Sequence, residues 1–140
     1  MNTKIEVKRI SDVIIWETAQ EHGWCRSIVT FDQNPSATTA IEVGTVLQDS
    51  EETGYHAACT VGASANAILL QRVSAAELIA GDVDAVALVR GPAIVKSGSL
   101  TIGGSGQTAA ALSALGILLI DYRTYPAKQE EGTTVEANPQ

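Results

Sequence analysis

Short runs rich in Val, Ile and Thr recur along the chain, and Asn, Pro, Asp and Gly residues separate them. Runs of this kind are typical of β-strands, and the separating residues are typical of turns. Their spacing predicts a mainly β fold, a small domain of the barrel or sandwich type. The expected strands span residues 26–31, 41–48, 54–61, 66–73 and 117–125.

The longest apolar β-run, residues 85–98, is interrupted at its middle by Arg90, Gly91 and Pro92. Proline has no N–H to donate to a β-ladder and biases the preceding residue away from helical torsions, so a central strand cannot run straight through. Glycine tolerates the torsions of a bulge or a barrel corner. The run is therefore predicted to form two strands with a bend, and the three residues at the bend are candidates for an interface.

One segment has the pattern of a short helix. Residues 107–116 are rich in Ala and Leu, Ser105 is a candidate N-cap, and Gly116 is expected at the C′ position. The piece at 74–83 contains helix formers closed by Gly81, but it is short, and we expect a loop or a single helical turn there. The fold is thus predicted to contain one short helix.

The N-terminal segment differs from the rest of the chain because it holds both tryptophans, Trp16 and Trp24. It is apolar without a helical period, so we expect it to pair as a strand, either with a sheet of its own chain or with a sheet of another chain. At the other end, residues 126–140 are too polar to pack a core. The apolar residues of the N-terminal segment are Ile5, Val7, Ile10, Val13, Ile14, Ile15 and Trp16.

Length and charge restrict the class of protein. A chain of 140 residues suits one domain. Its 9 basic and 16 acidic side chains give a net charge of −7, which disfavours direct binding to a nucleic acid. No basic start followed by an apolar stretch marks a secretory signal, and no apolar run approaches the roughly 20 residues that span a bilayer. We expect a protein made in the cytosol without a membrane anchor.

Two His-x-x-Cys pairs, His22 with Cys25 and His56 with Cys59, have the residue types of a tetrahedral zinc site. Zinc knuckles need each pair on a tight turn. The second pair lies in an expected strand, where residues three apart point to opposite faces of the sheet. We therefore expect no metal site.

Residues 104–109 fit the glycine-rich pattern G-x-G-x-x-A between an expected strand at 99–102 and the expected helix, and Asp121 lies on the next strand. Such a loop can hold a pyrophosphate, with the carboxylate on a ribose hydroxyl. The helix is short, however, and the preceding residues lack the alternating strands and helices of a doubly wound sheet. A nucleotide-binding enzyme is kept as an alternative. No nucleophile elbow or phosphate loop is present, and we expect no catalytic residue and no cofactor.

A series of motifs runs in order along residues 11–120. They are Ser-Asp…Glu followed by Arg26, Gly-Thr-Val-Leu at 44–47, Arg-Gly-Pro at 90–92, and Ala-Leu…Leu-Gly-Ile at 111–117. The series and its spacing resemble the head decoration proteins of tailed phages, the lambda decoration-protein family. The N-terminal segment is more apolar than that of the lambda protein, and the residues beyond Tyr125 extend past the resemblance.

The resemblance implies a homotrimer that is not an enzyme and that acts as a cement protein. It implies binding to the major capsid protein on the outer surface of the expanded phage head, where the trimer stabilises the shell against the pressure of packaged DNA. It divides the chain into a capsid-binding arm at 1–25, a β-rich decoration domain at 26–125 and a polar tail at 126–140. The seven apolar residues named above would form the binding surface of the arm. Another self-assembling β-rich virion or tail component is a second alternative.

Overall fold

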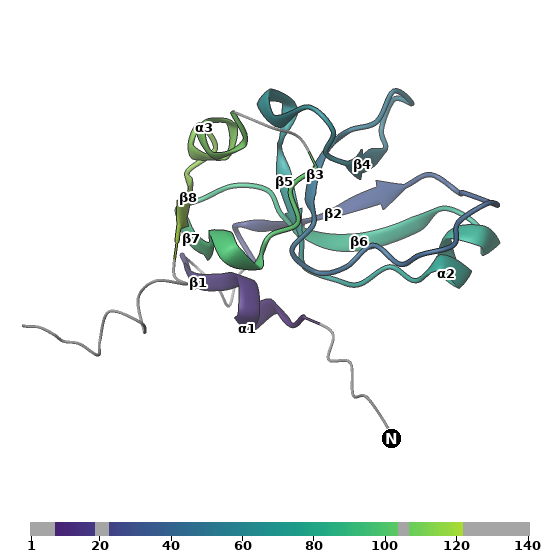
Figure 1. Cartoon of the computed structure of the whole chain (residues 1–140), viewed down its shortest axis with the longest axis horizontal. Helices are drawn as coiled ribbons and strands as arrows, with labels where there is room; N and C mark the ends of the chain where they lie inside the picture. Colours follow the sequence, from purple (N-terminus) through teal and green to yellow (C-terminus); the bar gives the residue numbers. More distant parts are fainter. Residues whose placement is uncertain (1–7, 19–22, 104–106, 122–140) are drawn as a thin grey trace, which may run out of the picture.

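The computed structural model describes residues 8–18, 23–103 and 107–121, which form two sheets (Figure 1). The strands are β1 Ile14–Glu17, β2 Arg26–Phe31, β3 Val46–Asp49, β4 His56–Ala58, β5 Ala67–Leu69, β6 Val83–Leu88, β7 Ala93–Lys96 and β8 Ile117–Ile120. Five strands close into a ring in the order β2-β4-β3-β5-β6, and three form a separate sheet in the order β1-β7-β8. The mainly β fold of the barrel or sandwich type is confirmed.

The ring is held mainly by antiparallel ladders. The longest joins β2 to β6, from Arg26 opposite Leu88 to Phe31 opposite Val83. β2 and β4 are parallel and pair only at Phe31 and His56, so the ring is completed at a single point. One hydrophobic core belongs to the ring and consists of Val29, Phe31, Leu47, Ala67, Leu69, Val73, Leu78, Val83, Ala85 and Ala87.

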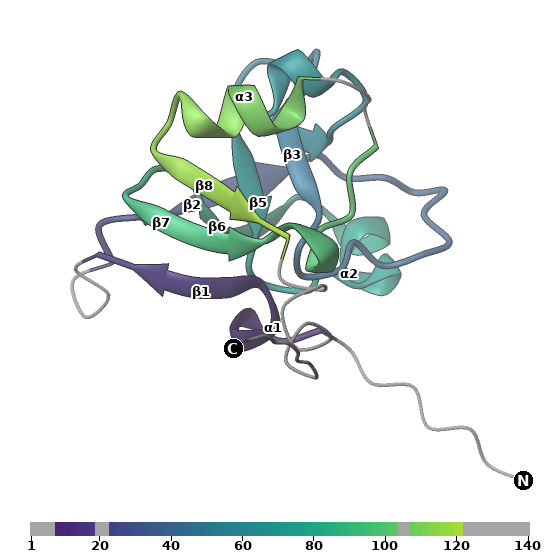
Figure 2. The same ribbon diagram turned by 60° about the vertical axis from the view of Figure 1, so that its left-hand side comes forward.

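The three-stranded sheet packs against the outside of the ring, and a second core lies between them (Figure 2). β1 is antiparallel to β7, and β7 is parallel to β8. The ring contributes Val46, Ile68 and Leu88 to this core, and the sheet contributes Val95 and Ile117. Side chains alternate between the two faces of a strand, so β5 is covered on both faces. This explains why its sequence is apolar at successive positions instead of alternating.

The described residues include the α-helices α1 Ile10–Val13, α2 Ala75–Ala80 and α3 Thr108–Ser113. The structure differs from the sequence expectation at 74–83, where α2 is a helix of 6 residues rather than a loop or a single turn. The Glu77 amide donates to the Ser74 hydroxyl, and the Ser74 amide donates to the Glu77 carboxylate. This reciprocal capping box satisfies amide groups at the helix start and stabilises a helix that its helix formers alone would not.

Helix α3 lies within the expected helix at 107–116 but is shorter. Its C-cap is Ala114, so Gly116 lies two residues beyond the cap rather than at C′. Gly116 has φ +89°, the left-handed conformation that glycine adopts at low cost. The candidate N-cap, Ser105, lies outside the described residues.

The bend predicted within residues 85–98 is confirmed. β6 ends at Leu88, β7 begins at Ala93, and the peptide bond between Gly91 and Pro92 is cis. The two strands on either side of the bend belong to different sheets, because β6 is in the ring and β7 is the centre of the small sheet. The bend is therefore the place where the chain leaves one sheet for the other.

The remaining strand predictions hold in part. β2 matches the expected strand at 26–31, whereas β3, β4 and β5 are shorter than expected. The expected strand at 99–102 is replaced by the 3-10 helix η3, Ser97–Ser99, and one bridge between Thr45 and Thr101. Among the described residues, no helix has the length and apolar character to cross a bilayer.

Candidate functional site

The N-terminal segment is where the sequence predicts a binding surface, and its described part is folded onto the domain. β1 pairs with β7 of the same chain, which is the first of the two pairings considered for this segment. Ile10 and Ile14 pack against the second core. Within the described range, Val13 is 0% exposed, whereas Ile15 is 37% and Trp16 is 49% exposed. Ile5 and Val7 lie outside the described residues.

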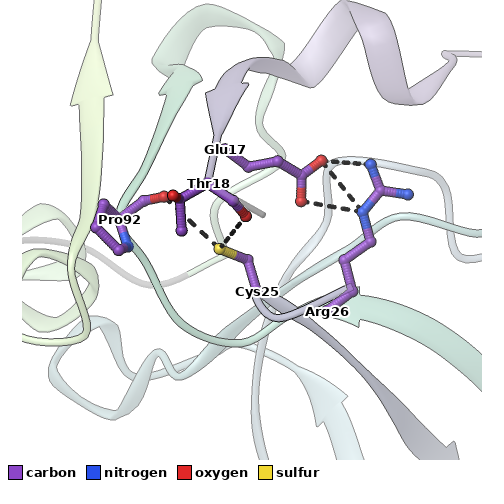
Figure 3. Close-up of polar contacts among 5 residues, drawn as sticks. All are labelled: Glu17, Thr18, Cys25, Arg26 and Pro92. Carbon is purple, nitrogen blue, oxygen red and sulfur yellow. Dashed lines mark hydrogen bonds and ion pairs between the residues drawn. The ribbon is translucent and has the colours of Figure 1, made fainter. Parts of the chain in front are cut away.

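A buried ion pair anchors the end of β1 to the ring (Figure 3). Arg26 Nε donates to both carboxylate oxygens of Glu17, at 3.1 and 3.2 Å, and Arg26 Nη2 also donates to this carboxylate. Glu17 is only 4% exposed. The hydrogen bond to Glu17 raises the pKa of Arg26 above its ordinary value, so the guanidinium stays charged. A buried carboxylate needs such a partner, and the Glu and Arg26 of the first motif are explained by this pair.

Cys25 adds a second anchor beside the ion pair (Figure 3). Its thiol lies 3.6 Å from the carbonyl oxygens of Thr18 and Pro92, and the Thr18 amide donates to Pro92 O at 3.1 Å. Cys25 is 0% exposed. The thiol therefore joins the end of β1 to the bend before β7.

The start of the described N-terminal segment is fixed as well. The Lys8 ammonium donates to Ser99 O at 2.7 Å. The Arg9 amide donates to the Asp12 carboxylate at 2.9 Å, which caps α1. Gly44, in the second motif, has φ +93°, and a Cβ there would lie 2.7 Å from Ser99 O. The backbone can pass this close to η3 only because the residue is glycine.

The third and fourth motifs meet at a contact between two glycines. A Cβ on Gly91 would lie 1.9 Å from Gly116 O, so the two backbones touch directly. The Gly91 amide donates to Leu115 O at 2.8 Å, and the Ala93 amide donates to Gly116 O at 3.1 Å. The Arg-Gly-Pro and Leu-Gly-Ile motifs therefore place β7 beside β8.

The predicted interface residues at the bend have different roles. Gly91 serves the backbone contact just described. The Arg90 guanidinium lies 4.9 Å from the centre of the Trp24 ring and donates from Nη1 to Trp24 O. Pro92 is exposed, and Arg90 is partly exposed. A role for Arg90 and Pro92 in binding a partner stays a prediction.

The outward surface of the three-stranded sheet is apolar. Trp16 lies opposite Ile94, and Ile94 lies opposite Leu118, so the three form one row across β1, β7 and β8. Ile120 follows on β8 beside Lys96. Figure 2 looks onto this surface, and no labelled helix or strand lies in front of it. We call Trp16, Ile94, Leu118 and Ile120 the outer sheet face.

Most carboxylates of the described chain lie on the ring and its turns instead, and Asp12, Glu17 and Asp121 are the described ones outside it. Asp82 accepts from the Tyr55 hydroxyl at 2.8 Å and from the Gln33 amide at 2.9 Å. The hydrogen bond from the Gln33 amide, followed by that from Tyr55, lowers the pKa of Asp82. The outward positions of β1, β7 and β8 hold no carboxylate. The ring and its turns hold Asp32, Glu42, Asp49, Glu51, Glu52, Glu77, Asp82 and Asp84.

The alternative chemistries find little support in the described residues. Cys59 Sγ lies 3.1 Å from Val61 O, His56 Nε2 lies 3.6 Å from the Asp49 carboxylate, and His22 is outside the described range. No cluster of three or more potential metal ligands is found in that range. Residues 104–106 of the glycine-rich loop are also outside it, and the strands around the loop do not form a doubly wound sheet.

Comparison with known proteins identifies the family. A model of the family described as bacteriophage lambda head decoration protein D matches residues 3–120. The match contains both sheets and all four motifs. In the structure the first motif holds β1 on the ring, the second lets the backbone pass close to η3, and the third and fourth hold β7 beside β8. A search of curated proteins finds no match. The chain belongs to the lambda head decoration protein D family, a family of structural proteins of the phage head.

Proposed function

We propose that the protein is a cement protein that binds as a homotrimer to the major capsid protein on the outer surface of the expanded head. The family match over residues 3–120 is the observation that carries this proposal. The trimer would occupy three-fold and quasi-three-fold positions and stabilise the shell against the pressure of packaged DNA. The family is not one of enzymes, and the protein is proposed to need no cofactor.

The proposed capsid-binding arm is the N-terminal segment. Residues 1–7 precede Lys8, where the described structure begins, and they include Ile5 and Val7. An extended segment that adds to a capsid sheet gains main-chain hydrogen bonds, but ordering it costs about 1–2 kcal/mol of backbone entropy per residue. One arm alone should therefore bind weakly. The anchors at Glu17 and Cys25 support this role, because they fix β1 to the domain and so limit the freedom of the arm at its base.

Trimerisation would make weak arms effective. Three arms on one particle raise the effective concentration of each, and avidity exceeds the affinity of a single arm by about 10²–10⁴. A protein that binds only the expanded shell stabilises that state by mass action. The stabilisation is about 4 kcal/mol per site at a thousandfold excess over the Kd.

Cosedimentation with phage heads tests the proposed function. The full chain is expected to pellet with expanded heads and to remain in solution with unexpanded heads, and light scattering is expected to give the mass of a trimer. A variant lacking residues 2–7 should keep the fold and the trimer, because the anchors lie later in the chain, and should lose most of its binding. Binding to tails instead of heads, seen by electron microscopy, would favour the other virion component considered above.

A further inference from the structure

We propose that the outer sheet face, Trp16, Ile94, Leu118 and Ile120, docks on the capsid shell and so extends the binding surface of the N-terminal arm, to which Trp16 belongs, onto β7 and β8. This inference rests on the proposed binding to the capsid. It adds residues of β7 and β8, which are far from the arm in sequence. The occupant that we propose is an apolar patch of the major capsid protein.

The geometry of this face is that of a contact surface. The register places Trp16, Ile94 and Leu118 side by side, and Ile120 extends the row along β8. Neighbouring side chains on one face of a sheet are close enough to act as a single patch. Trp16 is 49% and Leu118 is 52% exposed. An aromatic anchor flanked by aliphatic side chains is a common composition for the centre of a binding surface.

The distribution of exposed apolar residues points to the same face. The large hydrophobic residues that are exposed in the described chain are Ile15, Trp16, Trp24, Ile28, Val61, Ile79, Ile102, Leu115, Leu118 and Ile120. Three of these ten, Trp16, Leu118 and Ile120, belong to the outer sheet face, and Ile15 is next to Trp16 on β1, whereas Ile28, Val61, Ile79 and Ile102 lie on four different segments outside this sheet. Single exposed apolar side chains are normal, but a row of them marks an interaction site.

The outer sheet face carries fewer charged side chains than the ring and its turns, so it is less costly to remove from water. The chain has a net charge of −7, yet the outward positions within β1, β7 and β8 carry Lys96 and no carboxylate, and Asp121 follows directly after the end of β8. Burying an ionised carboxylate without a partner is strongly unfavourable, so the acidic ring is poorly suited to a dry contact. Docking through the outer sheet face would leave the ring and its turns in solvent.

Two observations favour the shell over a second copy of the chain. Residues 1–7 begin the proposed arm at 1–25, which leads in sequence through α1 into β1, and Trp16 of the outer sheet face is itself a residue of this arm. A flat face that packs on the same face of another copy makes a two-fold contact, whereas a three-fold ring requires two different patches. Packing of this face on the same face of another copy would therefore give dimers instead of the proposed trimer, and its use as one of the two patches of a trimer contact is the outcome that the test below separates.

The test compares two matched variants of the full chain on expanded heads. Leu118→Lys places a charge within the proposed face, between Ile94 and Ile120. Ile28→Lys makes the same change on the outside of the ring, where Ile28 is 59% exposed. We expect Leu118→Lys to keep the trimer and the thermal unfolding temperature but to weaken binding at least about tenfold. The Ile28→Lys control should bind like the unmodified chain.

The outcomes separate this inference from the proposed function. Unchanged binding of Leu118→Lys to heads would overturn the inference and leave the arm intact as a proposal. Loss of the trimer in this variant would also overturn it, since the face would then be a contact between copies. A photo-crosslinking residue at position 118 gives an independent readout: the adduct should contain capsid protein, and an adduct between two copies contradicts the inference. If the unmodified chain fails to bind heads, both proposals fall.

Discussion

The five-stranded ring and the three-stranded sheet are both made of short apolar strands, yet they use their faces differently. The ring encloses one core and shares a second with the sheet, so Val46 and Leu47 on the same strand are buried in different cores. The sheet is buried on one face only and leaves Trp16 and Leu118 in solvent. The ring is thus the scaffold, and the sheet is the part of the molecule suited to meeting another protein.

The four sequence motifs form contacts between the ring and the sheet and between strands of the sheet. Glu17 with Arg26 and Gly91 with Gly116 do not form the outer sheet face. The Glu17–Arg26 pair holds β1 on the ring, and the Gly91–Gly116 contact holds β7 beside β8 within the sheet. These motif residues build the fold, whereas the apolar side chains of the outer sheet face are the ones proposed to contact the partner.

The largest expected difference in stability is between substitution of a leucine in the ring core and substitution of a leucine on the outer sheet face. Leu47→Ala leaves a cavity in the ring core and should lower the free energy of unfolding by about 2–5 kcal/mol. Leu118→Ala removes an exposed side chain and should change this free energy by less than about 0.5 kcal/mol. Urea denaturation followed by fluorescence measures both. Equal destabilisation by the two variants would contradict the assignment of Leu47 to the core and of Leu118 to a solvent-exposed face.

Substitution at the contact between Gly91 and Gly116 is expected to have the second-largest effect on stability. Gly91→Ala drives a methyl group into Gly116 O and should destabilise the protein by about 3 kcal/mol, at the upper end of overpacking costs. Gly81→Ala is the control, because nothing lies within 4 Å of a Cβ there. A small effect of Gly91→Ala would mean that β7 and β8 can move apart, and the sheet would not be rigidly joined at that point.

Breaking the ion pair between Glu17 and Arg26 is expected to lower stability by a smaller amount. Glu17→Gln leaves the Arg26 charge without its partner and should cost about 2 kcal/mol, less than for a fully buried pair because the Arg26 side chain is 27% exposed. The control is Glu42→Gln, which breaks the exposed pair with Arg72 and should cost less than about 1 kcal/mol. If the two variants were equal, the anchor of β1 would be no stronger than a surface pair.

Acid should weaken the ring through Asp82, and this is the smallest effect. Hydrogen bonds lower the pKa of Asp82 in the folded state, so its contribution to stability is complete above its unfolded pKa and is lost as the pH falls through the folded value. Stability measured from pH 6 down to pH 2 should fall less steeply in Asp82→Asn than in the unmodified chain. Identical slopes would show that this carboxylate does not couple the turns of the ring.

Local patterns in the sequence predict several elements correctly. The strand at 26–31 and the bend at Pro92 follow from residue types alone. Helix α2 is longer than the sequence prediction of a loop or a single turn. Its signal is nevertheless local, since Ser74 and Glu77 have the spacing of a capping box. The spacing of Ser74 and Glu77 is therefore a sequence signal for this helix.

Local sequence patterns do not predict contacts between residues that are far apart in the chain. Pairing of β1 with β7 joins residues about 80 positions apart, and the contact between Gly91 and Gly116 depends on that arrangement. Leu118 and Ile94 lie in apolar runs that resemble core strands, and only the register shows that their side chains face solvent. The outer sheet face therefore had no signature in the sequence beyond Trp16.

Hydrogen–deuterium exchange of the full chain, free and bound to expanded heads, tests most directly which region meets the shell. Binding through the sheet predicts slower exchange in β1 and β8, at residues 14–17 and 117–120, with unchanged exchange in the turn between β3 and β4 at 50–55. Slower exchange confined to that acidic turn, with none in β1 and β8, would contradict the assignment of the sheet as the binding region.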